Sequence, residues 1–263
     1  MTAESISGAF ALRRSRGQAA LVPYVTAGHP HPDVTVDVLS GLAEAGADVL
    51  ELGIPFSDPL ADGPTIQRSS FAALRHGTTT ASALQALRAF RRAHDTPVVL
   101  FTYLNPVLRH GVDAFLSDAA EAGAQGLLIT DLPAGADPPL EERMRSSGLD
   151  LVRLVAPTTR PERIPAIAAS GSGFLYYISR TGVTGARASL RETLAEEVGR
   201  LREMVTLPVA VGFGISTPGQ AAAVASVADG VVVGSALVRT LEEWGVDAGI
   251  RFVASLRAEM DAR

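Results

Sequence analysis

The chain has 263 residues, of which 47% are hydrophobic and 19% charged, and its formal net charge is −5. This composition fits a globular protein with a sizeable core, and the mild negative charge argues against nucleic acid or an anionic membrane as a partner. The chain has no cysteine and no lysine, which excludes disulfides, thiolate metal sites, cysteine nucleophiles, Schiff bases and P-loops.

The N-terminal segment places its arginines after its apolar residues, which is unlike a signal peptide. No later apolar run approaches the roughly 20 residues that cross a bilayer, so we expect a cytoplasmic protein. The segment before Ala20 predicts an extra helix that closes the bottom of the fold.

Short apolar, β-branched runs then alternate with amphipathic stretches rich in alanine and leucine. The runs predict buried strands of a parallel sheet, at residues 20–26, 47–52, 97–101, 126–130, 150–155, 173–177, 208–211 and 230–233. The stretches between them predict helices, at residues 34–45, 81–93, 113–122, 141–147, 161–170, 190–204, 218–226 and 246–261.

Eight strand–helix units without a break in composition predict an α/β protein, a single (β/α)8 TIM barrel over residues 1–263. Gly46 and Gly123 follow similar Glu-Ala sequences, and each suits the left-handed cap that ends a helix before the next strand. A doubly wound open sheet is the alternative. The sequence after the first strand, Thr26-Ala27-Gly28-His29-Pro30, lacks the glycine-rich fingerprint that such a sheet usually carries.

Residues 50–67, LELGIPFSDPLADGPTIQ, carry three carboxylates at the end of the second strand and in the rigid loop after it. Glu51 either pairs with an arginine or transfers protons, and we favour the latter because function in barrels collects at the carboxyl ends of strands. Asp62 either caps the helix that starts near Pro64 or takes part in catalysis, and its spacing leaves both open. Asp58 has the same ambiguity, with partner contact as a further option.

Glycines recur after the last three strands, at 182–185, at 212–214 and at Gly234. Their backbone N–H groups can approach an anion closely, and a helix opening at Gly234-Ser235 would point its positive end there, so we predict a phosphate site. The loop 182–185 is long enough to act as a lid. The five histidines show no metal-binding spacing and no GxSxG nucleophile motif is present. These features describe a barrel that holds a phosphorylated substrate and moves protons with carboxylates.

Residues 50–67 resemble the signature of the tryptophan synthase α subunit family, and the resemblance extends along essentially the whole chain. It includes the stretches 23–28, 102–106, 130–133, 179–185 and 234–235. The resemblance implies a retro-aldol cleavage of indole-3-glycerol phosphate to indole and glyceraldehyde 3-phosphate without a cofactor. One departure is Gly28-His29-Pro30-His31-Pro32, where the family commonly has acidic residues after the glycine.

The resemblance also implies a role for individual residues. Glu51 would be the general acid–base group, and Asp62 would accept a hydrogen bond from the indole N–H and stabilise the protonated ring. Thr184 would orient Asp62 when the lid closes. The indole pocket would be lined by Tyr24, Tyr103, Leu128, Val155 and Tyr176, and the phosphate would be held by Gly185, Phe213, Gly214, Gly234 and Ser235.

The family works as an α2β2 complex whose β subunit carries pyridoxal phosphate and receives the indole. The resemblance therefore implies a β-subunit partner, contacted by Pro55, Asp58 and Asn105, and no cofactor or metal in this chain. Two alternatives stay open: a stand-alone indole-releasing lyase, and a non-catalytic module that binds the phosphate ligand and activates β. A phosphate-binding barrel isomerase of histidine or tryptophan biosynthesis is a more distant alternative.

Overall fold

The computed structural model describes residues 5–179, 187–212 and 214–262. In this part of the chain, parallel strands form one sheet in the order β5-β4-β3-β2-β1-β9-β8-β7-β6. The strands are β1 (Ala20–Thr26), β2 (Leu50–Gly53), β3 (Val98–Thr102), β4 (Gly126–Ile129), β5 (Asp150–Leu151), β6 (Arg153–Val155), β7 (Leu175–Ile178), β8 (Val209–Gly212) and β9 (Gly230–Val233). The two ends of this order, β5 and β6, are separated in sequence only by Val152. The sheet therefore closes into the predicted barrel, with β5 and β6 sharing one strand position.

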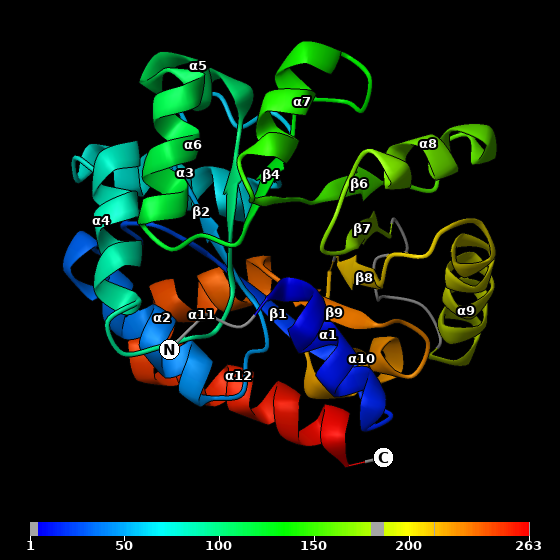
Figure 1. The fold of residues 1–263 in the computed structure, drawn as a ribbon. Helices are drawn as coiled ribbons and strands as arrows, with labels where there is room; N and C mark the ends of the chain where they lie inside the picture. Colours follow the sequence, from blue (N-terminus) through cyan, green and yellow to red (C-terminus); the bar gives the residue numbers. More distant parts are fainter. Residues whose placement is uncertain (1–4, 180–186, 213, 263) are drawn as a thin grey trace.

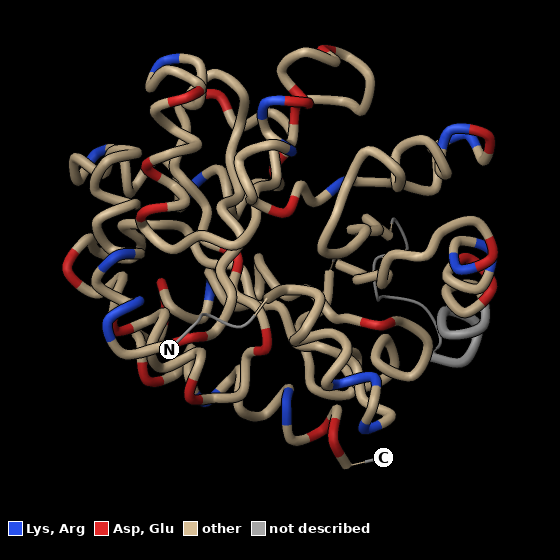
Figure 2. The backbone as a smooth tube through the Cα atoms, viewed as in Figure 1, with Lys and Arg blue, Asp and Glu red and all other residues tan. Residues whose placement is uncertain are grey.

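Helices surround the strands, and Figure 1 shows them as an outer layer around the sheet. Their bounds are α1 (Ile6–Ser15), α2 (Thr35–Glu44), α3 (Pro64–Arg75), α4 (Thr80–Phe90), α5 (Leu104–His110), α6 (Val112–Glu121), α7 (Pro138–Ser146), α8 (Ile164–Ala169), α9 (Arg187–Met204), α10 (Pro218–Ala225), α11 (Ser235–Trp244) and α12 (Val246–Asp261), with short 3-10 turns η1 (Pro32–Val34) and η2 (Pro161–Arg163). Figure 2 shows that charged residues lie mainly on these outer helices and loops. Among the described residues, no helix is both long and apolar enough to cross a membrane.

The alternation of side chains along the strands separates two apolar clusters. Outward-facing residues such as Leu50, Leu100 and Val231 pack against the helices in a large outer cluster. Inward-facing residues such as Val99 and Leu128 fill the barrel, where they meet α1.

The N-terminal helix α1 closes the bottom of the barrel, as predicted. Its buried Ile6, Ala9 and Phe10 belong to the interior cluster. The Phe10 ring stacks on Phe174 at 5.2 Å between centroids. A Cβ at Gly230 would lie 2.8 Å from the Phe10 ring. Glycine at this strand position therefore leaves space for the Phe10 side chain of α1.

The observed elements follow the predicted ones with small shifts at their ends. β1, β9 and α12 have the predicted bounds, whereas β2 begins three residues later than predicted, at Leu50. The sequence prediction missed α5, a helix of seven residues that contains a proline. It begins where the Leu104 N–H donates to Asp131 Oδ1 at 2.7 Å. This contact comes from another loop, so local periodicity could not reveal it.

Candidate active site

Glu51 lies inside the upper part of the barrel, where the register pairs it with Tyr24 on β1 and Val99 on β3. The residue is 1% exposed, and its Oε1 has no hydrogen-bond partner among the described residues. Burial raises the pKa of this carboxyl from its ordinary 4.5 to about 8, because the low-dielectric interior disfavours the charged form. Glu51 is thus predominantly protonated at neutral pH, with its carboxylate form within reach. A group of this kind can both donate and accept a proton.

Asp62 lies in the loop between β2 and α3, and its carboxylate faces Tyr103. Tyr103 Oη donates to Asp62 Oδ2 at 2.9 Å and accepts from the Ala61 N–H at 3.0 Å. Burial raises the pKa of Asp62 to about 6, and the Tyr103 hydrogen bond opposes that rise. The N-cap residue of α3 is Gly63, and no side chain caps this helix. Asp62 therefore does not serve as the helix cap that its spacing allowed.

Two further tyrosines extend across the upper end of the barrel, each beside a glycine. A Cβ at Gly53 would lie 2.1 Å from Tyr24 Oη, and a Cβ at Gly212 would lie 2.4 Å from Tyr176 Oη. Burial is the largest cause that raises the pKa values of both phenols, and the negative charges of Asp62 and Glu51 raise them further, while the Thr26 hydrogen bond opposes the rise at Tyr24. Both phenols are therefore neutral, and both lie close enough to Asp62 and Glu51 for the charges of these groups, when ionised, to raise their pKa values.

The two predicted aliphatic pocket residues, Leu128 and Val155, face opposite sides of the barrel wall. Leu128 belongs to the interior cluster, as the pocket prediction requires. Val155 belongs instead to the outer cluster, whereas its neighbour Leu154 packs with the interior one. The prediction of Val155 as a pocket residue is therefore corrected to Leu154, because adjacent residues of a strand face opposite sides.

The sequence reasoning also missed two residues that pack against Tyr24. Phe101 makes an edge-to-face contact with the Tyr24 ring at 5.1 Å, and Ile66 shares a small buried cluster with it. Residue alternation along β3 would have placed Phe101 on the same face as Val99. Ile66 comes from the first turn of α3, and only the folded structure brings it to the pocket.

The predicted phosphate residues are only partly described. Gly234 is the N-cap of α11 and Ser235 its first residue, and Val238 in the same helix packs with Tyr24. The N-terminus of α11, which favours anions, therefore lies at the same end of the barrel as the carboxylates. Gly214 follows β8 with a φ of 74°, which favours glycine. Thr184, Gly185 and Phe213 lie outside the described residues.

The predicted partner-contact residues differ in exposure. Asp58 and Asn105 are exposed, whereas Pro55 is buried. Close to them in sequence, Leu60 is 88% exposed and Leu108 is 55% exposed. Sequence reasoning did not select these two leucines, because exposure of an apolar residue becomes visible only in the fold.

A cavity of about 530 Å³ opens where β4 and β6 separate. Its lining includes the interior residue Leu154 as well as Thr130, and also Arg153, Arg160 and Arg163. The Arg153 guanidinium pairs with the buried Glu141 carboxylate. Among the described residues, no group of histidine, aspartate and glutamate is arranged to hold a metal ion.

Comparisons with known proteins agree on one family. The family model described as tryptophan synthase alpha chain matches residues 10–260. The alpha chain of Geotalea daltonii is 50% identical over 91% of this chain and 90% of its own length, and that of Acidiphilium cryptum is 47% identical over 92% and 88%. The crystal structure of the Legionella pneumophila subunit alpha superposes with a TM-score of 0.90 at 37% identity, covering both chains completely. A Mycobacterium tuberculosis tryptophan synthase structure gives a TM-score of 0.90 at 40% identity, over 99% of this chain and 100% of that one.

Proposed function

The chain belongs to the tryptophan synthase alpha chain family, and we propose on this basis that it cleaves indole-3-glycerol phosphate to indole and glyceraldehyde 3-phosphate. As an alpha subunit it is a lyase of tryptophan biosynthesis. The observation that best supports the specific reaction is Glu51, a buried carboxyl whose Oε1 is without a hydrogen-bond partner among the described residues and whose pKa is about 8.

In the proposed reaction, the neutral Glu51 carboxyl gives its proton to ring carbon C3, which bears the glycerol chain. The positive charge moves to the ring nitrogen, where the Asp62 carboxylate accepts a hydrogen bond from the N–H and stabilises the cation. The Glu51 carboxylate then removes the proton from the hydroxyl on the adjacent chain carbon. The bond between the ring and the chain breaks, its electrons restore the indole, and the aldehyde forms. Glu51 ends the cycle protonated again.

The other predicted residues divide between the two ends of the substrate. We propose that Tyr24, Tyr103, Leu128, Leu154 and Tyr176 line the indole pocket. The phosphate would meet the α11 N-terminus at Gly234 and Ser235, together with Gly214, Phe213 and Gly185, while Thr184 would orient Asp62. The interior position of Leu128 and the helix position of Gly234 support this division.

Replacement of Glu51 tests the proposed reaction. Glu51→Gln keeps the shape of the side chain but removes the transferable proton, so indole release should fall by about 10²- to 10⁴-fold. Glu44→Gln, the same substitution at an exposed position on α2, should keep full activity. Indole release by each variant is followed with and without an added β subunit. Activity of Glu51→Gln within tenfold of the wild type would overturn the assignment.

We further propose that residues 1–263 form a single domain that pairs with a β subunit as an α2β2 complex, with pyridoxal phosphate carried only by β. The exposed Leu60 and Asp58 in the loop after β2, together with the exposed Asn105 in α5, support a partner surface here. The same assays separate the alternatives. A stand-alone lyase would release indole at a rate that β does not change. A non-catalytic activator would raise β activity without cleaving the substrate.

A further inference from the structure

Three buried hydroxyl groups form a continuous chain between β1 and α3. Tyr24 Oη lies 3.3 Å from Thr26 Oγ1, which lies 2.7 Å from Ser69 Oγ. Ser69 Oγ in turn donates to the Ile66 carbonyl at 2.9 Å. Thr26, Ser69 and the Tyr24 side chain are all buried, so these contacts take the place of water.

The carbonyl at one end fixes the direction of every proton in this chain. A carbonyl oxygen only accepts hydrogen bonds, so the single Ser69 proton must point to Ile66. Ser69 Oγ therefore accepts the Thr26 proton, and Thr26 Oγ1 accepts the Tyr24 proton. In the opposite arrangement, Ser69 Oγ and the Ile66 oxygen would face each other at 2.9 Å with no proton between them. The Tyr24 phenol thus donates its only proton to Thr26, so any further hydrogen bond at Tyr24 Oη must be one that it accepts.

The surroundings of Tyr24 keep the phenol in this state. Gly53 leaves the space that Tyr24 Oη occupies, and Phe101 and Val238 hold the ring from its sides. Burial and the charges of Asp62 and Glu51 raise the phenol pKa, so the group does not ionise. Its register partner is Glu51, which places the phenol on the strand next to the proposed proton-transfer group.

We propose that Tyr24 Oη is a fixed hydrogen-bond acceptor for a hydroxyl group of the bound substrate, and that Thr26 and Ser69 are the positioning residues that hold it in this role. The inference rests on the proposed function, because the glycerol chain supplies the hydroxyl. Glu51 deprotonates the hydroxyl on the chain carbon that is bonded to the ring. The hydroxyl that Tyr24 would accept from is the other one, on the next carbon of the glycerol chain. Tyr24 therefore favours substrates that carry a hydroxyl on the chain carbon next to the one bonded to the ring. Its ring also makes the apolar contact with the indole.

The test compares the substrate with an analogue that has no chain hydroxyls, 3-(indol-3-yl)propyl phosphate. Tyr24→Phe keeps the ring but removes the acceptor, so KM for indole-3-glycerol phosphate should rise about 3- to 10-fold, as expected for one lost hydrogen bond. The inhibition constant of the analogue should change less than 2-fold. An equal change for both compounds would show that the hydroxyl acts only through packing and would overturn the proposal.

Substitutions of the two positioning residues test the direction of the chain. Thr26→Val removes the hydroxyl that links Tyr24 to Ser69, so it should raise KM for the substrate but not the inhibition constant of the analogue. Thr26→Ser retains this hydroxyl and should have the wild-type KM. Ser69→Ala should raise KM in the wild type but add nothing in the Tyr24→Phe background, because its effect passes through Tyr24. Ser70→Ala, at the adjacent buried serine, is the matched control. Additive effects of Ser69→Ala and Tyr24→Phe would contradict the coupling.

The same measurements separate failure of this inference from failure of the proposed function. If the wild type neither cleaves the substrate nor binds the analogue, the proposed function fails and this inference fails with it. If the wild type does both and Tyr24→Phe does not distinguish the two compounds, only the inference fails. The Thr26→Val and Thr26→Ser pair keeps the test decisive should Tyr24→Phe fold poorly.

Discussion

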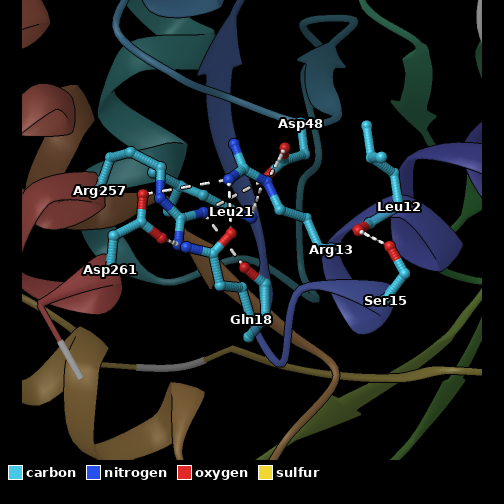
Figure 3. Close-up of polar contacts among 9 residues, drawn as sticks. Leu12, Arg13, Ser15, Gln18, Leu21, Asp48, Arg257 and Asp261 are labelled. Atoms are coloured by element: carbon cyan, nitrogen blue, oxygen red, sulfur yellow. Dashed lines mark hydrogen bonds and ion pairs between the residues drawn. The ribbon is translucent and has the colours of Figure 1, made fainter.

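Asp48 and Glu51 lie at opposite ends of the same strand region, and both are largely buried, yet their surroundings differ completely. At the bottom of the barrel, Asp48 accepts hydrogen bonds from Arg13 Nε at 2.5 Å, Arg257 Nη1 at 3.2 Å and the Leu21 N–H at 2.8 Å (Figure 3). At the top, Glu51 Oε1 has no such partner in the described part of the chain. Burial raises the pKa of both carboxyls. Only at Asp48 do neighbouring donors oppose that rise.

The difference separates a carboxylate that stabilises the fold from one that is available for chemistry. Asp48 joins α1 and α12 through Arg13 and Arg257, and it joins β1 through the Leu21 N–H. Arg257 also donates to the Ala19 carbonyl and pairs with Asp261. These contacts hold the two ends of the chain against the barrel. Among the residues that the structure describes, Glu51 makes no comparable ion pairs. Because it is buried without donors among these residues to stabilise its charge, its pKa lies near neutrality.

The largest expected change in stability follows from removing Asp48. Asp48→Ala would leave Arg13 and Arg257 with only the more exposed Asp261 carboxylate as a shared partner among the described residues. Loss of one partner of a buried pair costs about 3–5 kcal/mol of unfolding free energy. Urea denaturation measures this change. The kcat of the folded variant should stay near that of the wild type, because the site lies at the other end of the barrel.

Asp229 offers a matched control for Asp48. It precedes β9 as Asp48 precedes β2, and its Oδ2 accepts the Val209 N–H at 2.9 Å. Its arginine partners, Arg14 and Arg202, are about half exposed, so water replaces the lost charge pair and Asp229→Ala should cost less. Equal losses for the two variants would show that the buried arginines add nothing to the bottom of the barrel.

Glu51 should make stability depend on pH, because burial raises its pKa and no neighbouring donor within the described ranges opposes that rise as donors do at Asp48. A folded-state pKa raised from 4.5 to about 8 means that the folded protein binds the proton more tightly. The contribution to stability is therefore complete below pH 4.5 and is lost as the pH rises toward 8. Its full size is on the order of 3–5 kcal/mol.

Urea titrations at several pH values between 5 and 9 measure this dependence. The wild type should lose unfolding free energy across this range, and Glu51→Gln should lose much less, since glutamine does not titrate. Asp62 titrates in both proteins and cancels in the comparison. Parallel curves for the two proteins would show that Glu51 is paired or hydrated in the native state, which would remove the contrast with Asp48.

The contrast also explains what the sequence could reveal. The apolar runs identified every strand position of the barrel, and a glutamate at the end of one run marked Glu51 as unusual. The Asp48 network was invisible because its arginines lie 35 and 209 residues away in sequence. The family resemblance placed Val155 in the pocket, and only the folded strand shows that its neighbour Leu154 is the one that faces inward. The rejection of Asp62 as a cap likewise needed the folded start of α3, where Gly63 is the N-cap residue and no side chain of a described residue caps the helix.

The smallest expected effect concerns Asp62, which is intermediate between the two extremes. Unlike Glu51 it has a hydrogen-bond donor, Tyr103, and unlike Asp48 no arginine opposes its burial. Because that hydrogen bond lowers the Asp62 pKa, Tyr103→Phe should raise it above about 6. The acid limb of the kcat/KM profile should then move to higher pH by less than about one unit, since a single neutral hydrogen bond is involved.

Tyr176→Phe provides the comparison for this shift, since its hydroxyl lies against Gly212 and not against the Asp62 carboxylate. The position of its acid limb should match the wild type even if its turnover differs. If the limb stays in place in Tyr103→Phe as well, the group that ionises there is not Asp62. Asp62 would then have to stabilise the indole cation without titrating in this pH range. The hydrogen bond from Tyr103 to Asp62 would have no effect on function.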